Sequence, residues 1–393
     1  MDNDAVNGGG RIVVLGMHRS GTSCVGELLA AMGAYFGPPS MGNRGNDENP
    51  HGLFERNDLR RLCHFILQQA RAEWWRTSGL SPDRIPPAPR AEIEAMLADL
   101  DAHRPWFVKE PRLCLLLPML RAQLGTVMGV CVWRDPREVA KSLRTRDAIP
   151  IAFGLALWER YVRASFAAGV PVTIVSYNRL IADPAGTTRQ LLADLVALGV
   201  EGLRMPSAEQ LGQVIDPAFH RSRPDHSGAD RSLTEPQRRL LAALERGDPA
   251  DPELAKPLSS EQIATLGRLE RARRNQMKVA AYRSLGDARA SRPSQTEIAA
   301  ALRYIPWNPV QWLRWLRCGK LHQRLRQHLE ACRIAASGAF DGAWYVKHYP
   351  DVTGKDPIMH FVRYGAAEGR DPSPSFPTKR HLHAVLDARS AND

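Results

Sequence analysis

The chain has 393 residues and a formal net charge of +11, and its composition is 44% hydrophobic and 24% charged. This length allows one large domain plus something smaller, and the composition is typical of a soluble globular protein rather than a fibrous or disordered chain. The excess positive charge indicates acidic partners, but charge alone does not choose among nucleotides, anionic glycans, nucleic acid and a membrane surface.

The N-terminal sequence and the cysteines indicate a reducing compartment. The first residues, MDNDAVNGGG, are polar and acidic and do not form a signal peptide, and no apolar run approaches the ~18 residues of a membrane-spanning helix. The six cysteines contain no CxxC pair, so buried thiols are expected rather than disulfides or a zinc site. We therefore expect a cytoplasmic protein, with any membrane contact peripheral and at the inner face.

A strand, a glycine-containing loop and a helix are predicted in the stretch RIVVLGMHRSGTSCVGELLAAM. Residues 12–15 are β-branched or aliphatic and long enough for one buried strand. Gly16 and Gly21 bracket a tight loop, and Thr22 or Ser23 is expected to cap the helix that follows. Backbone N–H groups and the positive end of the helix dipole then meet at one point, which predicts a site for phosphate or sulfate.

The cation of this loop differs from that of loops that bind nucleotide triphosphates. Those loops read GxxxxGK[ST], with a lysine that reaches the outer phosphates. Here Gly16 and Gly21 keep the spacing, but Thr22 follows the second glycine, and the cation is Arg19 inside the loop. A glycine turn that only packs a helix on a strand is the alternative interpretation.

Further strands and helices follow in alternation, which predicts an α/β fold with a parallel sheet covered on both faces. The loops HRSG, KEPR, RDP and YNR all follow strands, so we expect them to meet at the sheet edge where such folds bind ligands. Trp74 and Trp75 are expected in the core, with a substrate-facing position as the alternative. The predicted helices span residues 54–75, 90–102, 113–124, 137–146, 151–168 and 180–198, and the strands 106–109, 127–133 and 172–177.

The pattern loosens beyond about residue 225. Residues 307–332 combine tryptophan and leucine with a dense basic face. This segment would lie on an anionic membrane or a partner, or dock on its own protein as a solvated helix. The predicted regions are an α/β domain at 11–225, a basic helical region at 226–335 and a small aromatic-rich module at 336–378.

A second group of anion-binding side chains is predicted in VWRDPREVAKSLRTR. Arg134 ends a strand, and Ser142 and Arg146 lie four residues apart on one face of the following helix. The planar arginine fork matches phosphate oxygens, and a serine hydroxyl adds a donor. The alternative is a surface helix with ordinary charges.

Together the two motifs resemble those of the PAPS-dependent sulfotransferase family. HRSGTS is similar to the family's 5′-phosphosulfate loop, and the spacing R-x-P-x-x-x-x-x-S from Arg134 to Ser142 is similar to its 3′-phosphate motif. Tyr177 stands where the family has Tyr-Glu-x-Leu and contacts the nucleotide, with a structural tyrosine as the alternative. The resemblance covers about residues 11–225 and assigns to cofactor binding His18, Arg19, Ser20, Gly21, Thr22, Ser23, Arg134, Ser142, Arg146 and Tyr177.

Three residues are candidates for the chemistry. Arg19 and Lys109, whose KEPR resembles the K-D-P of related enzymes, would stabilise charge on the transferring group, and Glu55 would accept the proton of the acceptor hydroxyl. The alternatives are a structural ion pair for Lys109 and a helix-start charge for Glu55. His51 and Asp47 are the reserve candidates for the base. The sequence departs from the family pattern at His18, Glu110 and Asn178.

The resemblance implies transfer of a sulfuryl group from PAPS to a hydroxyl, with PAP as product and no metal. Residues 340–376 resemble a C-terminal unit of bacterial glycosyltransferases and surface-polysaccharide proteins. We therefore expect a glycan or lipid-linked glycan acceptor, contact with an anionic membrane or with polysaccharide-synthesis proteins, and no nucleic acid. The alternatives are a P-loop nucleotide kinase and a non-catalytic protein that uses this fold to bind an anion or a membrane.

Overall fold

A computed structural model describes residues 10–42, 54–81, 89–215, 233–287, 304, 315, 321–376 and 378. The chain divides into two compact units, residues 1–268 and residues 269–393. The domain boundary predicted at residue 225 lies outside the described residues, and the one predicted at residue 335 falls within the helix α15 (Leu321–Ser337).

A four-stranded parallel sheet forms the centre of the first unit and confirms the predicted α/β fold. The strand order is β2-β1-β3-β4, and β1 pairs with β2 on one side and with β3 on the other, so that Val13 lies opposite both Val108 and Gly129. The strands are β1 (Arg11–Leu15), β2 (Trp106–Lys109), β3 (Met128–Trp133) and β4 (Val172–Ser176).

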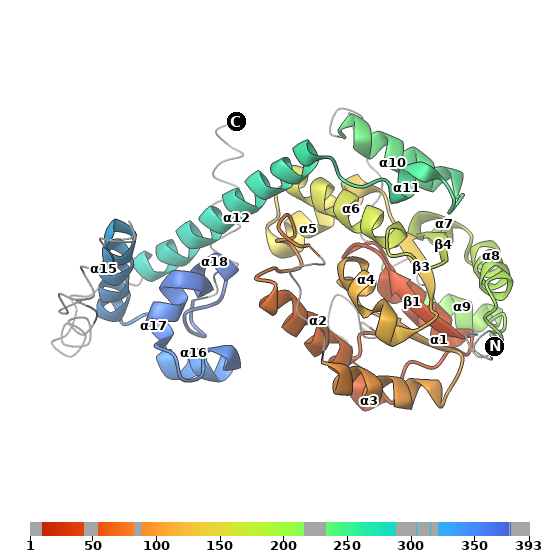
Figure 1. Ribbon diagram of the computed structural model, residues 1–393, viewed down its shortest axis with the longest axis horizontal. Helices are drawn as coiled ribbons and strands as arrows, with labels where there is room; N and C mark the ends of the chain where they lie inside the picture. The colour runs from red at the N-terminus through yellow and green to blue at the C-terminus, as the bar shows by residue number, and fades with distance from the viewer. Residues whose placement is uncertain are drawn as a thin grey trace. The chain divides into compact units, whose positions relative to one another are not determined.

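Helices of the same unit enclose the sheet (Figure 1). Ile12 and Val14 belong to a core cluster with side chains of α1, α8 and α9, whereas Val13 and Leu15 alternate with them along the strand and are also fully buried. Both faces are therefore covered, as a parallel sheet requires. The helices are α1 (Thr22–Ala31), α2 (Asn57–Gln69), α3 (Arg90–Asp101), α4 (Leu113–Leu124), α5 (Pro136–Asp147), α6 (Ile151–Phe166), α7 (Tyr177–Ala182), α8 (Pro184–Ala197) and α9 (Ala208–Val214).

Two local predictions were wrong. The predicted capping of α1 by Thr22 or Ser23 does not occur, because Gly21 is the N-cap residue, with φ 89° and no side-chain capping bond. The helix predicted over residues 54–75 spans only Asn57–Gln69, and just after it Arg71 adopts a left-handed φ of 52°. One face of α2 is buried, with Leu59, Leu62, Cys63, Ile66 and Leu67 as its buried residues.

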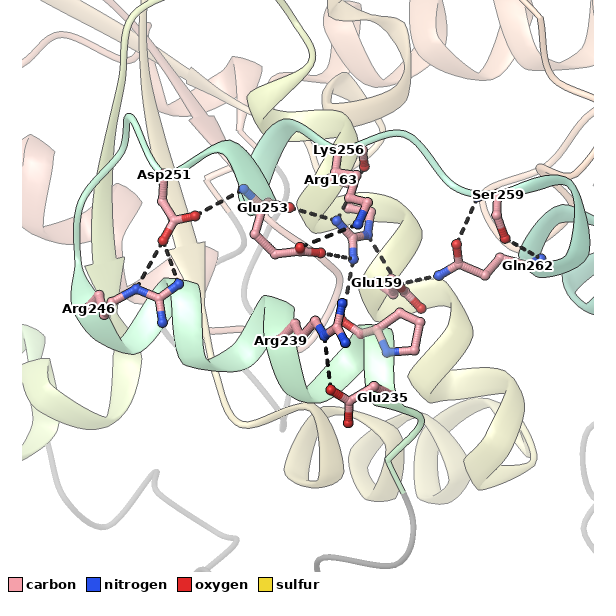
Figure 2. A network of polar contacts seen from close by, with 11 residues as sticks. Glu159, Arg163, Glu235, Arg239, Arg246, Asp251, Glu253, Lys256, Ser259 and Gln262 are labelled. Carbon is pink, nitrogen blue, oxygen red and sulfur yellow. Dashed lines mark hydrogen bonds and ion pairs between the residues drawn. The ribbon is translucent and has the colours of Figure 1, made fainter.

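A network centred on Arg163 attaches α10 (Glu235–Arg246), α11 (Pro252–Ala255) and the start of α12 (Ser260–Asp287) to α6. The side chain of Arg163 is only 4% exposed, and its guanidinium donates to the Glu159 carboxylate, the Glu253 carboxylate and three backbone carbonyls (Figure 2). Gln262 donates to the same Glu159 carboxylate at 2.6 Å. The buried charge is thus neutralised and its donors are all used.

The second unit has its own small core around Tyr345, which is fully buried and lies near the rings of Phe340 and Phe361. No helix among the described residues is long and apolar enough to cross a membrane. Of the basic segment predicted at residues 307–332, only residue 315 and the part from 321 onward are described. The elements after α15 are α16 (Gly342–His348), η6 (Pro350–Val352), α17 (Pro357–His360), η7 (Phe361–Gly365) and α18 (Ala366–Glu368).

Candidate active site

The four loops that follow the strands lie at the same edge of the sheet, because the strands are parallel. Direct contacts join two pairs of them. Arg19 Nε, in the loop after β1, donates to Ser142 Oγ on α5 at 2.8 Å across 123 residues of sequence. A Cβ atom added to Gly21 would meet the ring of Tyr177, the residue after β4, at 2.1 Å. The two sequence motifs therefore form one site.

The loop between β1 and α1 has the conformation of an anion cradle. Arg19 and Gly21 both have positive φ, 72° and 89°, and the Ser20 N–H donates back to Met17 O at 3.1 Å. A Cβ on Gly16 would lie 2.4 Å from the carbonyl oxygen of Val132, so the loop also rests closely on β3. Only glycine allows both close approaches, and turns with such positive φ angles are of the kind in which backbone N–H groups bind anions.

The hydroxyl of Ser20 is buried inside this loop without a hydrogen-bond partner among the described residues. Its residue is 0% exposed. Buried hydroxyls in folded proteins are nearly always hydrogen-bonded, because leaving one unpaired costs about 1–3 kcal/mol. A bound anion would supply the missing acceptor, so this orphaned donor fits the phosphosulfate that the sequence predicts here.

Arg134 is held by groups on α5 and α7. Its Nε donates to Glu138 at 2.7 Å, and its guanidinium carbon lies 5.1 Å from the centre of the Tyr177 ring. Asn178 donates to the other oxygen of Glu138 at 3.3 Å, and its own Oδ1 is buried without a partner among the described residues. Burial raises the pKa of the Tyr177 hydroxyl, which keeps it neutral at physiological pH.

Lys109 and Glu55, predicted from separate motifs, form an ion pair with Nζ 2.8 Å from Oε1. Lys109 is 2% exposed at the end of β2, whereas Glu55 is more open. The neighbouring Glu110 pairs with Arg112 at 2.7 Å. Because only Oε1 of Glu55 is bonded to a described residue, Oε2 remains able to accept a proton.

His18 packs within a group of aromatic and cationic side chains. Its ring lies 4.7 Å from that of Trp74 and 6.0 Å from that of Tyr161, centre to centre. Burial, followed by the charge of Arg146 and then those of neighbouring cations, holds the pKa of His18 well below its ordinary value. The imidazole is therefore neutral, and its buried Nε2 has no partner among the described residues. His18 shapes the packing behind the loop.

Comparisons with known proteins give a family and a solved structure that are similar to this chain. The model of a family described as the sulfotransferase family matches residues 11–198. Residues 11–198 are therefore similar to the sulfotransferase family. Among solved structures, the sulfotransferase domain of the Synechococcus PCC 7002 olefin synthase matches with 20% identity and a TM-score of 0.33, over 68% of this chain and 96% of that chain. No curated protein matches the chain.

The first unit brings together most of the residues predicted for the site. Thr22 and Ser23 open α1 beside the loop, and Arg146 lies one turn beyond Ser142, with its guanidinium carbon 6.0 Å from the centre of the Trp74 ring. The reserve bases His51 and Asp47 lie outside the described residues. Among the described residues, no cluster of His, Cys, Asp or Glu could hold a metal ion.

Sequence reasoning missed three residues of this site. Glu138 follows Arg134 by four residues on α5, and that spacing alone is a signal for an ion pair. Cys114 accepts from the Gly16 N–H at 3.0 Å and so supports the loop from α4, a contact that no sequence pattern announces. Trp74 was expected in the core, but only its neighbour Trp75 is fully buried.

Proposed function

We propose that the protein transfers a sulfuryl group from PAPS to a hydroxyl of a glycan or lipid-linked glycan and releases PAP. The observation that carries the proposal is the 2.8 Å hydrogen bond between Arg19 and Ser142. It joins the predicted 5′-phosphosulfate loop to the predicted 3′-phosphate motif, so one nucleotide with two anionic ends can contact both. Support for the glycan comes only from the resemblance of residues 340–376.

The residues present fit this nucleotide. The Ser20 hydroxyl, which lacks a partner among the described residues, and the backbone N–H groups of the loop would bind its 5′ end. The Arg134 fork and the Ser142 hydroxyl would bind its 3′-phosphate, and the Tyr177 ring would lie against the nucleotide. The loop lacks the lysine of nucleotide triphosphate-binding loops, which disfavours a nucleotide kinase.

When bound, PAPS supplies a sulfuryl group on a good leaving group, so the protein's task is to position the reactants and stabilise charge. Arg19 and Lys109 provide two fixed cations for this purpose. Lys109 also orients Glu55 through the 2.8 Å bond to Oε1, which leaves Oε2 to take the proton of the acceptor hydroxyl. In this proposal the ion pair contains both the cation that stabilises the transferring group, Lys109, and the base that accepts the proton, Glu55.

Calorimetry with PAP and 5′-AMP tests the cofactor. The wild-type protein should prefer PAP, which carries the additional 3′-phosphate, and Arg134→Ala should remove about tenfold to hundredfold of that preference while leaving 5′-AMP affinity unchanged. Arg90→Ala is the control, because Arg90 forms an exposed pair with Glu94 on α3. Equal wild-type affinity for PAP and 5′-AMP would contradict the proposal.

Transfer of labelled sulfate from PAPS to a panel of glycans tests the reaction itself. We expect label on a hydroxyl of at least one glycan in the panel and release of an equal amount of PAP. A protein that binds PAP but transfers label to no glycan in the panel would leave the cofactor assignment standing and remove the proposed acceptor class.

A further inference from the structure

Arg146 presents an open guanidinium edge beside the site of the proposed reaction. Its Nε donates to Asp147 at 2.6 Å, whereas its two terminal nitrogens have no hydrogen-bond partner among the described residues. The side chain is 30% exposed. The Nη1–Nη2 edge of an arginine is the part that binds a carboxylate or phosphate with two parallel hydrogen bonds.

Trp74 holds this guanidinium in place. The guanidinium carbon lies 6.0 Å from the centre of the indole ring, which is within the range of a cation–π interaction. The backbone of Trp74 is itself fixed, because Tyr161 on α6 donates its hydroxyl to Trp74 O at 2.7 Å. The hydrogen bond to Asp147 and the contact with the Trp74 ring therefore orient the Arg146 side chain before any ligand binds. This lowers the conformational entropy that the side chain loses on binding.

The position of Arg146 along α5 separates it from the nucleotide's arginine. Arg134 lies two residues before α5, and Arg146 is the penultimate residue of that helix, so the rise along α5 from its first residue to Arg146 is about 15 Å at 1.5 Å per residue. Ser142, which contacts Arg19, lies between them. Of the charges that lower the pKa of His18 in the loop, that of Arg146 is the largest, ahead of Arg112, Lys109 and Arg19. Arg146 and His18 both lie against the Trp74 ring, 6.0 Å and 4.7 Å from its centre, so Arg146 lies beyond Ser142 and close to the loop.

We propose that Arg146, held on Trp74, binds an anionic group of the acceptor, so that the acceptor is an acidic glycan. The inference rests on the proposed function and assigns Arg146 to the acceptor rather than to the cofactor predicted from sequence. Held beside the loop, the open edge of Arg146 would orient the sugar through its carboxylate or phosphate. A neutral sugar would leave the fork unpaired and would bind less tightly.

The test measures saccharide binding to the protein saturated with PAP. The carboxylate arm compares a glucuronate-containing tetrasaccharide with the same compound after its carboxyls are reduced, and the phosphate arm compares mannose 6-phosphate with mannose. In at least one arm the wild-type protein should bind the anionic probe about tenfold or more tightly than its neutral counterpart. Arg146→Gln should abolish that difference without changing PAP affinity, and Arg146→Lys should restore only part of it.

Arg144→Gln is the matched control, because it removes the same charge from the same last turn of α5. It should keep the preference for the anionic probe. The inference is overturned if the wild-type protein shows no preference in either arm, or if Arg146→Gln weakens PAP binding and leaves the preference intact. It is also overturned if Arg146→Gln only lowers the melting temperature, as the loss of a helix-end charge would. Absence of PAP binding to the wild-type protein would instead contradict the proposed function.

Discussion

Two buried polar clusters lie on either side of one helix and differ in how completely their hydrogen bonds are made. Arg163 on α6 makes five hydrogen bonds to α6, α10, α11 and the segment that follows α11. Two residues earlier on the same helix, Tyr161 faces the loop cluster, where Ser20 Oγ and His18 Nε2 are buried without partners among the described residues.

We interpret the fully bonded Arg163 cluster as structural and the loop cluster, which has unpaired polar atoms, as a candidate for ligand binding. Polar groups buried with all their bonds made add rigidity, and removing one partner leaves an uncompensated charge. Polar groups buried with bonds missing cost stability that a ligand can restore on binding. Substitutions in the Arg163 cluster should therefore affect unfolding, whereas substitutions in the loop cluster should affect binding and catalysis.

The largest effect is expected from Arg163→Met, which leaves the buried Glu159 without its cation and leaves the partly buried Glu253 with only Lys256. The free energy of unfolding should fall by about 3–5 kcal/mol in urea titrations, as for other broken buried ion pairs. Arg239→Met is the control, because its partner Glu235 and Arg239 itself are both exposed, and it should cost less than about 1 kcal/mol. Equal losses of unfolding free energy in the two variants would show that burial does not make the Arg163–Glu159 pair more stabilising than the Arg239–Glu235 pair.

Arg19→Ala tests whether the loop cluster contributes to catalysis. Turnover in the sulfate-transfer assay should fall by about 10²-fold or more, the scale of losing one preorganised charge-stabilising donor. Its unfolding transition should change less than that of Arg163→Met, because Arg19 is only partly buried whereas Arg163 is buried. A near-normal turnover would remove Arg19 from the mechanism.

Ser20→Ala should have opposite effects on stability and on binding. Removing an unpaired buried hydroxyl should raise the free energy of unfolding by about 1 kcal/mol and weaken PAP binding by about tenfold. The control is Ser165→Ala, whose equally buried hydroxyl donates to Tyr161 O at 3.0 Å and should therefore lose about 1 kcal/mol. Loss of stability in both variants would contradict the orphaned state of Ser20.

The smallest effect is a pH dependence from His18. Because burial and nearby cations lower its pKa in the folded state, the unfolded chain binds the proton first as pH falls below about 6.5. Stability is therefore lost on acidification and fully present above that pH. Between pH 7.5 and pH 6.0 the wild-type protein should lose about 0.8 kcal/mol more than His18→Gln, measured by urea unfolding at each pH. Identical slopes would mean that His18 titrates normally.

Local pattern predicted the elements well where hydrophobic runs were continuous. The strand at residues 106–109 and the helix at residues 113–124 have the bounds that were expected. The helix predicted from residue 54 was too long, because the chain turns after α2 and the two tryptophans belong to the turn rather than to the helix. The capping of α1 was wrong, because the helix already begins at Thr22 and its N-cap is Gly21 in the left-handed conformation.

The sequence by itself determined the α/β fold, and it predicted the anion-binding loop and the two cofactor motifs, because strand periodicity, glycine spacing and arginine–serine spacing are local properties. Only the tertiary structure decided which charges meet. It joined Arg19 to Ser142 and Lys109 to Glu55, and it placed Arg146 on Trp74. Such contacts depend on loop paths and side-chain packing between segments that are distant in the chain, and no local pattern encodes them.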